Sequence, residues 1–306
     1  MDAGRQTFPL IGLRRGVGAF GRTRRSTHRG SGYEMASSRP YQRGDNMRSI
    51  DWRASARLSS AHDSDEFIVR EHFAEESPRA VVFVDRRPAM GLYPPGLPWL
   101  RKPAAVAMAG RMIVDSVLAA QGLLGYLDLA DPYAPQWLPP RRRLDAPVIR
   151  DHELNRHVWT APEDNLARGF RHLVRLGSDV PRGTFIFVLS DFIETPPAPV
   201  WRMARARGLD VVPVIVQDPR WEQSFPDVGG IVLPLATPDG RLLPVRLTHA
   251  EAAERRAANE ARLRTLLDGF AAIEIDAVVL SSDDPLDILA AFVRWHDQRH
   301  LRLRLR

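Results

Sequence analysis

Short apolar runs alternate with amphipathic helical patterns over most of the chain from residue 79 onward. The apolar runs, typical of strands buried on both faces, lie at 81–85, 123–129, 184–191, 209–216 and 273–280. Apolar residues spaced three and four positions apart, typical of amphipathic helices, occur at 103–121, 165–176, 200–207, 248–269 and from 284 onward. Strands that alternate with helices form a mainly parallel sheet with helices on both faces. We therefore expect a doubly wound α/β fold.

Two local signals interrupt this alternation. The sequence Pro238-Asp239-Gly240 separates residues 231–236 from 241–247 and predicts a β-hairpin between them. Thr248 and Glu251 form a capping box, which predicts that a helix begins directly after the hairpin. The hairpin thus belongs to an insertion, at about residues 217–247, in the α/β domain.

The expected α/β domain spans residues 79–300. The chain before it differs in composition and lacks the alternation of strands and helices. Residues 1–31 are rich in Gly and Arg without periodicity, so we expect a flexible arm there. Residues 32–78 form an N-terminal extension dense in turns and charges, with one strand-like run at 66–73. The tail, residues 301–306, alternates Leu and Arg, which suits an edge strand or a disordered end.

The composition indicates an ordinary globular protein. Of the 306 residues, 43 are Lys or Arg and 37 are Asp or Glu, which gives a net charge of +6, and 44% are hydrophobic. This balance excludes wholesale disorder. The absence of cysteine excludes disulfides, thiolate metal sites and a cysteine nucleophile. No apolar run reaches the roughly 18 residues of a membrane span, and the first residues lack the apolar core of a signal peptide, so we expect a soluble, cytoplasmic protein.

Several motifs narrow the chemistry further. Neither the G-x-x-x-x-G-K-[ST] pattern of a P-loop nor the G-x-S-x-G pattern of a serine hydrolase occurs. Gly16-Val-Gly-Ala-Phe-Gly21 has the letters of a dinucleotide fingerprint, but no strand precedes it. The arginines of residues 5–29 leave an arginine-rich nucleic-acid-binding protein as one alternative, whose binding would weaken steeply with salt.

Two carboxylates end two of the expected strands. Asp85 ends the run that starts at residue 81, and Asp191 ends the run that starts at residue 184. The carboxyl ends of parallel strands meet at one edge of the sheet, which is the ligand edge of this fold class. We therefore expect Asp85 and Asp191 to lie at that edge.

Residues 41–57 form a dense block of turn residues, paired charges and aromatic residues that does not fit a simple helix or strand. Two interpretations stay open. Either the charged residues form a buried ion-pair lattice that pins the block to the main domain, or the block is a partner-binding surface. The residues of such a lattice would be Asp45, Arg48, Asp51 and Arg53.

The block, the strands that end in Asp85 and Asp191, and the segment 217–229 occur in an order that resembles the bacterial family called domain of unknown function 58. Members of that family are von Willebrand factor A-like proteins, usually encoded beside a MoxR-type AAA+ ATPase. The matching signature residues are Tyr41, Gln42, Gly44, Asp45, Arg48, Ile50, Asp51, Trp52, Arg53, Ala56 and Arg57. The resemblance covers about residues 33–295. The chain lacks the N-terminal membrane helices of longer members and so is similar to the short soluble type.

The resemblance implies a metal-site position at the sheet edge. A working von Willebrand A site offers Mg²⁺ an Asp-x-Ser-x-Ser run, a Thr and a later Asp. Here Asp85 and Asp191 remain. Arg87 and Ala89 replace the two serines, and Asp164 aligns with the Thr. In the interpretation that we favour, the Arg87 guanidinium lies between Asp85 and Asp191 and replaces the ion; in the other, Asp85, Asp164 and Asp191 still bind a divalent ion such as Mg²⁺.

For function, the resemblance implies a non-enzymatic interaction module that works with a MoxR-type AAA+ ATPase to mature or remodel client proteins. Metal-dependent enzymes, methanol dehydrogenase among them, are the kind of client found in related gene clusters. The docking surface would be the Asp85–Asp191 edge or the Arg48–Arg57 block, and no cofactor is expected. A hydrolase built on Asp85, Asp164 and Asp191 is a further alternative, which would need an activated water and a general base nearby.

Overall fold

Two compact units make up the computed structural model of the chain. The first, which we call the α/β unit, comprises residues 1–13 and 77–306; the second, the signature unit, comprises residues 14–76. The structure describes residues 6–10, 35–41, 50–62, 67–72, 77–92, 100–131, 134–141, 145–237 and 241–304. Within these ranges, every helix is too short or too polar to cross a lipid bilayer.

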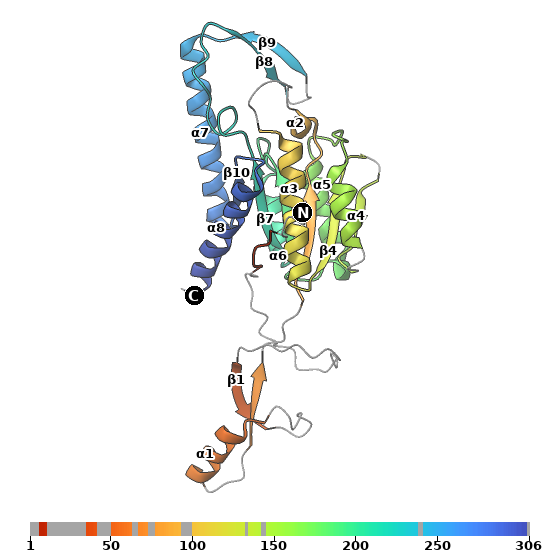
Figure 1. The fold of residues 1–306 in the computed structure, drawn as a ribbon, viewed down its shortest axis with the longest axis vertical. Helices are drawn as coiled ribbons and strands as arrows, with labels where there is room; N and C mark the ends of the chain where they lie inside the picture. The colour runs from red at the N-terminus through yellow and green to blue at the C-terminus, as the bar shows by residue number, and fades with distance from the viewer. Residues whose placement is uncertain are drawn as a thin grey trace, which may run out of the picture. The chain divides into compact units, whose positions relative to one another are not determined.

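A six-stranded sheet forms the centre of the α/β unit (Figure 1). Its order is β10-β7-β6-β3-β4-β5, and the strands are β3 (Arg79–Val84), β4 (Leu123–Asp128), β5 (Gln136–Leu138), β6 (Phe185–Ser190), β7 (Asp210–Val216) and β10 (Val278–Leu280). Neighbours pair in parallel except β5, which runs antiparallel to β4 at one edge. Counted along the chain, this is the doubly wound order 3-2-1-4-5-6, whose topological switch point lies between β3 and β6. The expected fold class is confirmed.

Helices cover both faces of the sheet (Figure 1). One face carries α3 (Lys102–Ala119), α4 (Ala146–Asp151) and α8 (Pro285–Arg304); the other carries α5 (Asn165–Arg175), α6 (Ala198–Ala206) and the second half of α7 (His249–Ala272). Short helical turns also occur at α2 (Pro88–Gly91), η3 (Glu153–Asn155) and η4 (Gly177–Asp179). Val82 of β3 belongs to the core under α3 and α8, and its neighbour Val81 to the core under α5 and α6. This two-sided burial explains why the strands are continuous apolar runs.

The hairpin insertion is formed as expected. β8 (Val232–Ala236) pairs antiparallel with β9 (Leu242–Arg246), which confirms the predicted hairpin. The capping box of Thr248 and Glu251 is present and opens α7. The hairpin and the first turns of α7 share a small core whose buried residues are Phe225, Leu247 and Ala252.

Residues 6–10 are packed into the α/β unit. The Phe8 ring is 3% exposed and stacks on Phe292 with 4.3 Å between ring centroids. The Phe8 N–H donates to Ser116 Oγ at 3.0 Å. The expectation of a flexible arm over residues 1–31 is therefore wrong for residues 6–10, because an aromatic ring there completes the core beneath α3 and α8. The other residues of that expected arm lie outside the described residues.

Two boundaries near the C-terminus differ from the expectation. α7 continues past Gly269, because Phe270 is buried in the core and holds the last turn in place. The last strand is correspondingly shorter than the expected 273–280. Residues 301–304 of the tail continue α8 rather than forming an edge strand, and the Arg302 guanidinium lies 2.5 Å from an Asp276 carboxylate oxygen.

The signature unit contains a strand pair and a helix. β1 (Met35–Pro40) pairs antiparallel with β2 (Ile68–His72), which confirms the strand-like run expected there. α1 (Trp52–His62) starts inside the block that was expected to be neither helix nor strand, so that expectation is wrong for the end of the block. The cause is a helix cap: the Asp51 carboxylate accepts two backbone N–H groups of the first turn at 3.2 and 3.1 Å.

Candidate functional site

The ligand edge of the sheet brings Asp85 and Asp191 together at the switch point. Asp85 follows β3 and Asp191 follows β6, and these two strands are neighbours. Both side chains are fully buried. In doubly wound sheets, the crevice beyond the carboxyl ends of the strands is where ligands bind, so this edge is the first place to look for a function.

Asp85 is held by donors from several elements. Arg87 Nη2 donates to its Oδ2 at 2.7 Å, and Ser190 Oγ donates to the same oxygen at 2.6 Å. Asn165 Nδ2, at the start of α5, donates to Oδ1 at 2.8 Å. The backbone N–H of Arg87 also donates to Oδ1, at 3.0 Å. Both carboxylate oxygens of Asp85 are therefore occupied by groups of the chain itself.

The Arg87 guanidinium lies between the two aspartates. Its Nη2 also donates to Asp191 Oδ1 at 3.1 Å, and its Nη1 lies 3.4 Å from Glu194 Oε2. The side chain is only 6% exposed. Burial alone would lower the pKa of Arg87, but the Asp85 and Asp191 carboxylates outweigh this effect and raise the pKa above its usual range. The guanidinium therefore stays charged, in the position that replacement of an ion requires.

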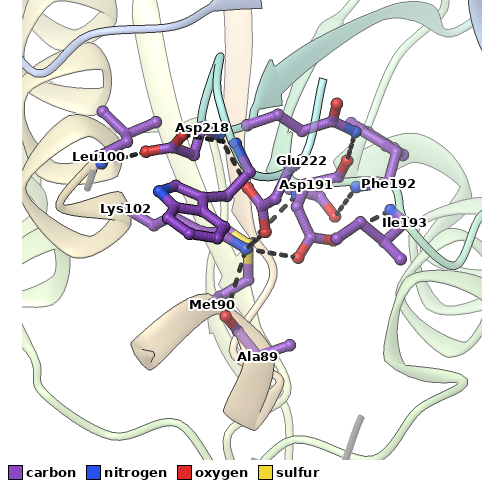
Figure 2. A network of polar contacts seen from close by, with 12 residues as sticks. Ala89, Met90, Leu100, Lys102, Asp191, Phe192, Ile193, Asp218 and Glu222 are labelled. Atoms are coloured by element: carbon purple, nitrogen blue, oxygen red, sulfur yellow. Dashed lines mark hydrogen bonds and ion pairs between the residues drawn. The ribbon is translucent and has the colours of Figure 1, made fainter. Parts of the chain in front are cut away.

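Lys102, the single lysine of the chain, supplies a second buried cation (Figure 2). Its Nζ donates to Asp191 Oδ2 at 3.0 Å and to the Ala89 carbonyl oxygen at 3.4 Å, and it forms an ion pair with Glu222. Burial alone would lower the pKa of Lys102, but Asp191 and Glu222 raise it above its usual range. An ammonium has three N–H donors, and these three acceptors engage all of them.

Lys102 was not among the residues expected at this site. It is the first residue of α3, and no motif marks it. One feature of the sequence could have drawn attention to it: Lys102 is the single lysine, and the chain has arginine at the other Lys or Arg positions. An ammonium is a compact point charge that fits between two converging carboxylates, whereas a guanidinium is planar and larger.

The loop after β7 completes the hydrogen-bond and ion-pair network around Lys102. Glu222 Oε2 accepts the Asp218 N–H at 2.8 Å, and Asp218 Oδ2 accepts the Leu100 N–H at 2.6 Å. Figure 2 shows these contacts around Lys102. The segment that begins α3 is thereby tied to the β7 loop on one side and to the β6 loop on the other.

The two carboxylates around Lys102 have pKa values shifted in opposite directions. Burial raises the pKa of Glu222; the Lys102 charge opposes this shift and the Asp191 charge adds to it. Burial would also raise the pKa of Asp191, but Lys102 and Arg87 outweigh it, so that pKa is lowered. Asp191 is thus the firmly ionised member of the pair.

The residue after Asp191 has an unusual backbone conformation. Phe192 has a φ of 50°, in the left-handed region that is rare for residues other than glycine. The surrounding structure holds it there: its ring is 1% exposed, its N–H donates to Ser190 Oγ at 3.1 Å, and Gln217 Nε2 donates to the Asp191 carbonyl at 2.5 Å. Strain of this kind concentrates at functional sites.

Asp164 does not take the role expected of it. It is exposed, and its carboxylate pairs with Arg168 of its own helix at 2.7 Å. The next residue, Asn165, is the one that reaches Asp85. Successive helix residues point in different directions, so an alignment shifted by one residue selects the wrong side chain. The three-carboxylate site of the less favoured interpretation is not formed. At the second serine position, Ala89 contributes its carbonyl oxygen to the network.

The residues present do not fit a divalent metal ion. Mg²⁺ and Ca²⁺ take several carboxylate, hydroxyl or carbonyl oxygens as ligands, whereas the oxygens of Asp85 and Asp191 are already bound to donors of the chain. In the part of the chain that the structure describes, no three His, Asp or Glu side chains are arranged to hold a metal. Two cationic side chains lie where the resemblance places an ion.

The neighbouring Arg86 belongs to a different network. It is 1% exposed and donates to the carbonyl oxygens of Glu153 and Arg156 at 2.5 and 2.6 Å, and to the Tyr126 hydroxyl at 2.9 Å. Of the two adjacent arginines, Arg87 is therefore the one that binds the strand-end aspartates.

A pocket of about 290 Å³ opens onto the charge network. Arg87, Lys102 and Asp191 form its buried floor. Its walls come from α2 and the residues after it, the start of α3, the loops before α5, after β6 and after β7, the β8–β9 hairpin, and α7. The apolar lining residues include Leu92, Leu100, Trp221, Phe225, Leu235 and Leu242.

Of the signature residues that the structure describes, Ile50 is buried and several others lie at the surface of their unit. Trp52 is 58% exposed and Tyr41 is 36% exposed; both rings contact Phe67 edge-on, at 5.8 and 6.5 Å between centroids. Arg53 and Arg57 are exposed as well. The ion-pair lattice stays a prediction, because Asp45 and Arg48 lie outside the described residues; within the unit, the exposed aromatic residues are of the kind that favours a partner-binding surface. The signature positions Gln42, Gly44, Asp45 and Arg48 lie outside the described residues.

The chain matches a protein family over most of its length. A sequence profile of the family described as Protein of unknown function DUF58 matches residues 37–264. No curated protein matches the chain. Among solved structures, the conserved hypothetical protein BatB from Bacteroides thetaiotaomicron is 13% identical, and the match covers 73% of this chain and 98% of that one at a TM-score of 0.40. The pilus adhesin SpaC from Lactobacillus rhamnosus GG is 11% identical, with 75% of this chain and 31% of that one covered at a TM-score of 0.42.

The family match extends from the signature unit into α7. It includes the block at residues 41–57, both strand-end aspartates and the hairpin insertion, which are the features on which the resemblance was based. The resemblance is thereby confirmed, and the chain belongs to the DUF58 family.

Proposed function

We propose that the chain is a non-enzymatic protein-interaction module that works with a MoxR-type AAA+ ATPase to mature or remodel client proteins. The ATPase enters through the resemblance, because members of the family are usually encoded beside one. Metal-dependent enzymes, methanol dehydrogenase among them, are the client class that the resemblance favours. The observation that carries the docking role is the switch-point geometry, a closed charge network that forms the floor of an apolar-walled pocket.

The network suits docking better than catalysis. Arg87 and Lys102 are each bound to carboxylates of the chain, so neither is poised to act on a substrate. The Ser190 hydroxyl donates a hydrogen bond to Asp85 and is fully buried, so it is not accessible to a substrate. Of the described residues that line the pocket, none is a histidine, the commonest general base for activating water.

The hydrolase alternative loses support for the same geometric reason. It required Asp85, Asp164 and Asp191 to share one ion. Asp164 instead forms an ion pair on the surface of α5, and the other two carboxylates are bound to cationic side chains.

Nucleic-acid binding through residues 5–29 also loses support. Phe8 and Phe20 were the aromatic residues available there for stacking on bases. Phe8 is buried against Phe292 instead. Most of this arm lies outside the described residues, and the salt dependence of binding is the measurement that tests it.

An affinity pull-down from a lysate of the source organism tests the proposed function. The tagged full chain is incubated with and without a slowly hydrolysed ATP analogue, and recovered proteins are identified by mass spectrometry. We expect recovery of an AAA+ ATPase that depends on the analogue. Recovery of nucleic acid alone, or of no protein at low salt, would contradict the proposal.

Surface variants assign the docking surface. Trp52→Ala removes an exposed aromatic ring of the signature unit, and Leu242→Asp places a charge on the pocket wall at a side chain that is 44% exposed. Leu286→Asp is the matched control, because Leu286 is 65% exposed and does not line the pocket. Docking at the switch point predicts that Leu242→Asp reduces ATPase recovery and that Leu286→Asp does not. A loss in Trp52→Ala alone would assign docking to the signature unit.

A further inference from the structure

We propose that the pocket at the switch point binds a peptide segment of a partner protein that combines an apolar anchor side chain with a neighbouring Lys or Arg. The anchor lies against Trp221, Phe225 and Leu242, and the basic group lies against Glu163 and Glu194. This inference rests on the proposed docking function and names the chemistry of the partner. It is the reverse of a metal-dependent site, in which an acidic side chain of the partner completes the shell of the ion.

The floor of the pocket is closed to an acidic partner. Each N–H of the Lys102 ammonium already has an acceptor in the chain. Arg87 donates to Asp85 from Nε and Nη2, and its Nη1 lies 3.4 Å from Glu194. An incoming carboxylate would have to displace one that is already bound. The displaced group would remain buried without its partner, which is strongly unfavourable.

The network carries negative charge on balance. Its cations Arg87 and Lys102 face four carboxylates, which are those of Asp85, Asp191, Glu194 and Glu222. Arg262 also lines the pocket; its Nη2 donates to the Glu222 carbonyl at 2.6 Å and its Nη1 donates to Asn259 at 2.8 Å. With Arg255, Arg87 and Lys102 it makes four lining cations, against the five lining carboxylates of Glu163, Asp191, Glu194, Asp218 and Glu222, and Asp85 adds a sixth carboxylate beside Arg87. The field at the pocket therefore attracts a cationic side chain and repels an anionic one.

Glu163 and Glu194 bring this charge to the pocket rim. Glu163 is exposed, and the Glu194 side chain is 46% exposed. Glu194 contacts Arg87 directly, and both glutamates line the pocket. At the α7 side of the pocket, the Arg255 guanidinium lies 5.9 Å from the centre of the Phe225 ring. The two sides of the pocket thus differ in charge, and a basic group is favoured at the glutamate side.

The other walls of the pocket are apolar. Trp221 and Phe225 pack edge to face, with 5.5 Å between ring centroids, and Leu100 is 7% exposed. On the hairpin, Leu242 lines the pocket and is 44% exposed. An exposed apolar side chain in a pocket wall favours an interaction site. An aliphatic or aromatic anchor in the pocket would bury it.

The hairpin is not suited to accept an added strand. Pro234 of β8 lies directly opposite Pro244 of β9. Proline has no N–H to offer to a neighbouring strand, and proline on an edge strand blocks strand addition. Both strands of the hairpin are interrupted in this way at their centres. The partner segment therefore docks through side chains in the pocket and does not extend the sheet.

Selection from a phage-displayed library of random dodecapeptides on the purified full chain tests the inference. The expected binders carry Leu, Ile, Phe or Trp beside Lys or Arg, and they bind equally well with and without EDTA. The most enriched peptide is then synthesised with a fluorescent label, and its affinity is measured by anisotropy.

Charge reversal at the rim gives the sharpest comparison. We expect the double variant Glu163→Lys, Glu194→Lys to bind the labelled peptide roughly tenfold more weakly or worse, because two attractive contacts become repulsive. The double variant Glu163→Gln, Glu194→Gln loses the attraction without repulsion and should give an intermediate loss. Asp268→Lys reverses a charge on the exposed surface of α7 outside the pocket lining and should leave the affinity unchanged.

Several results would overturn the inference. These are enrichment of acidic peptides, binding that needs a divalent ion, equal affinity for the wild-type and charge-reversed chains, or a selection that returns no binder. The pull-down separates this failure from failure of the proposed function. Equal recovery of an AAA+ ATPase by the wild-type and charge-reversed chains would defeat this inference alone. Basic, apolar binders without recovery of an ATPase would support the inference and defeat the ATPase partnership.

Discussion

The Lys102 ammonium lies 3.0 Å from Asp191 Oδ2, beneath the pocket, and joins the first turn of α3 to the loop after β6. Through Glu222, the same ammonium also holds the loop after β7. One side chain thus connects three segments that the doubly wound topology brings to the same edge of the sheet. The candidate docking face is ordered before any partner arrives, which lowers the entropic cost of binding.

Replacing Lys102 by Met leaves two buried carboxylates short of a cation. We expect a loss of about 3–5 kcal/mol in the free energy of unfolding, typical of removing one partner of a buried ion pair. Urea unfolding measures it. Arg101→Met is the matched control: Arg101 pairs with Asp283 but is 66% exposed, so its loss should cost about 1 kcal/mol or less. Equal effects of the two substitutions would show that the buried network is not stabilising.

Arg87→Ser restores a serine two residues after Asp85, as in a metal-binding run. The substitution frees oxygens of Asp85 and Asp191 that Arg87 now occupies. We expect Mg²⁺ or Mn²⁺ to raise the melting temperature of this variant, measured by scanning calorimetry, and to leave that of the wild-type chain unchanged. Adding Asp191→Asn removes a ligand and should abolish the rise. A rise of equal size in the wild-type chain would mean that the arginine does not take the place of an ion.

The pH dependence of stability should report the Glu222 carboxyl. Its pKa is raised in the folded chain above the usual 4.5, so its contribution to stability is present below pH 4.5 and is lost as the pH rises through the folded pKa. Glu222→Gln removes this loss, so the variant should gain stability relative to the wild-type chain as the pH rises from 4.5. Asp191 acts with the opposite sign: its lowered pKa gives stability that is present above pH 3.8 and is lost as the pH falls.

Urea unfolding at a series of pH values checks the Glu222 prediction. A difference between Glu222→Gln and the wild-type chain that does not change with pH would contradict the proposed effect of burial on Glu222.

The Asp85–Asp191 part of the site was predictable because it follows from local patterns and topology. Each aspartate ends an apolar run, and parallel strands bring their carboxyl ends to one edge whatever the details of packing. Arg87 was predictable because it lies two residues from Asp85. Lys102 was not, because it binds Asp191 across 89 positions of sequence and no local pattern encodes that distance.

Two further differences between prediction and structure come from the direction of residues at a helix start and from the packing of one isolated aromatic residue. Asp164 and Asn165 are adjacent in sequence, and only the direction of the first turn of α5 decides which one faces Asp85. Phe8 is a lone aromatic residue near a Gly- and Arg-rich stretch, and its burial depends on Phe292 at the other end of the chain. Packing between distant segments decides such cases.

Truncation of Phe8 tests the packing of residues 6–10. The ring is 3% exposed, and Phe8→Ala is expected to lower the free energy of unfolding by about 3–5 kcal/mol, as is usual for a buried phenylalanine. Pro9→Ala changes the exposed neighbour and should have a much smaller effect. An unchanged urea midpoint for Phe8→Ala would indicate that these residues belong to a free arm after all.

The central claim is that cationic side chains of the chain itself fill the switch point, and both the docking role and the chemistry proposed for the partner depend on it. A crystal structure of the wild-type chain grown with Mn²⁺, read from the anomalous scattering of manganese, tests this claim most directly. We predict Arg87 and Lys102 bound to Asp85 and Asp191, with no anomalous peak between the two carboxylates. A peak coordinated by Asp85 and Asp191, with Arg87 displaced, would contradict it.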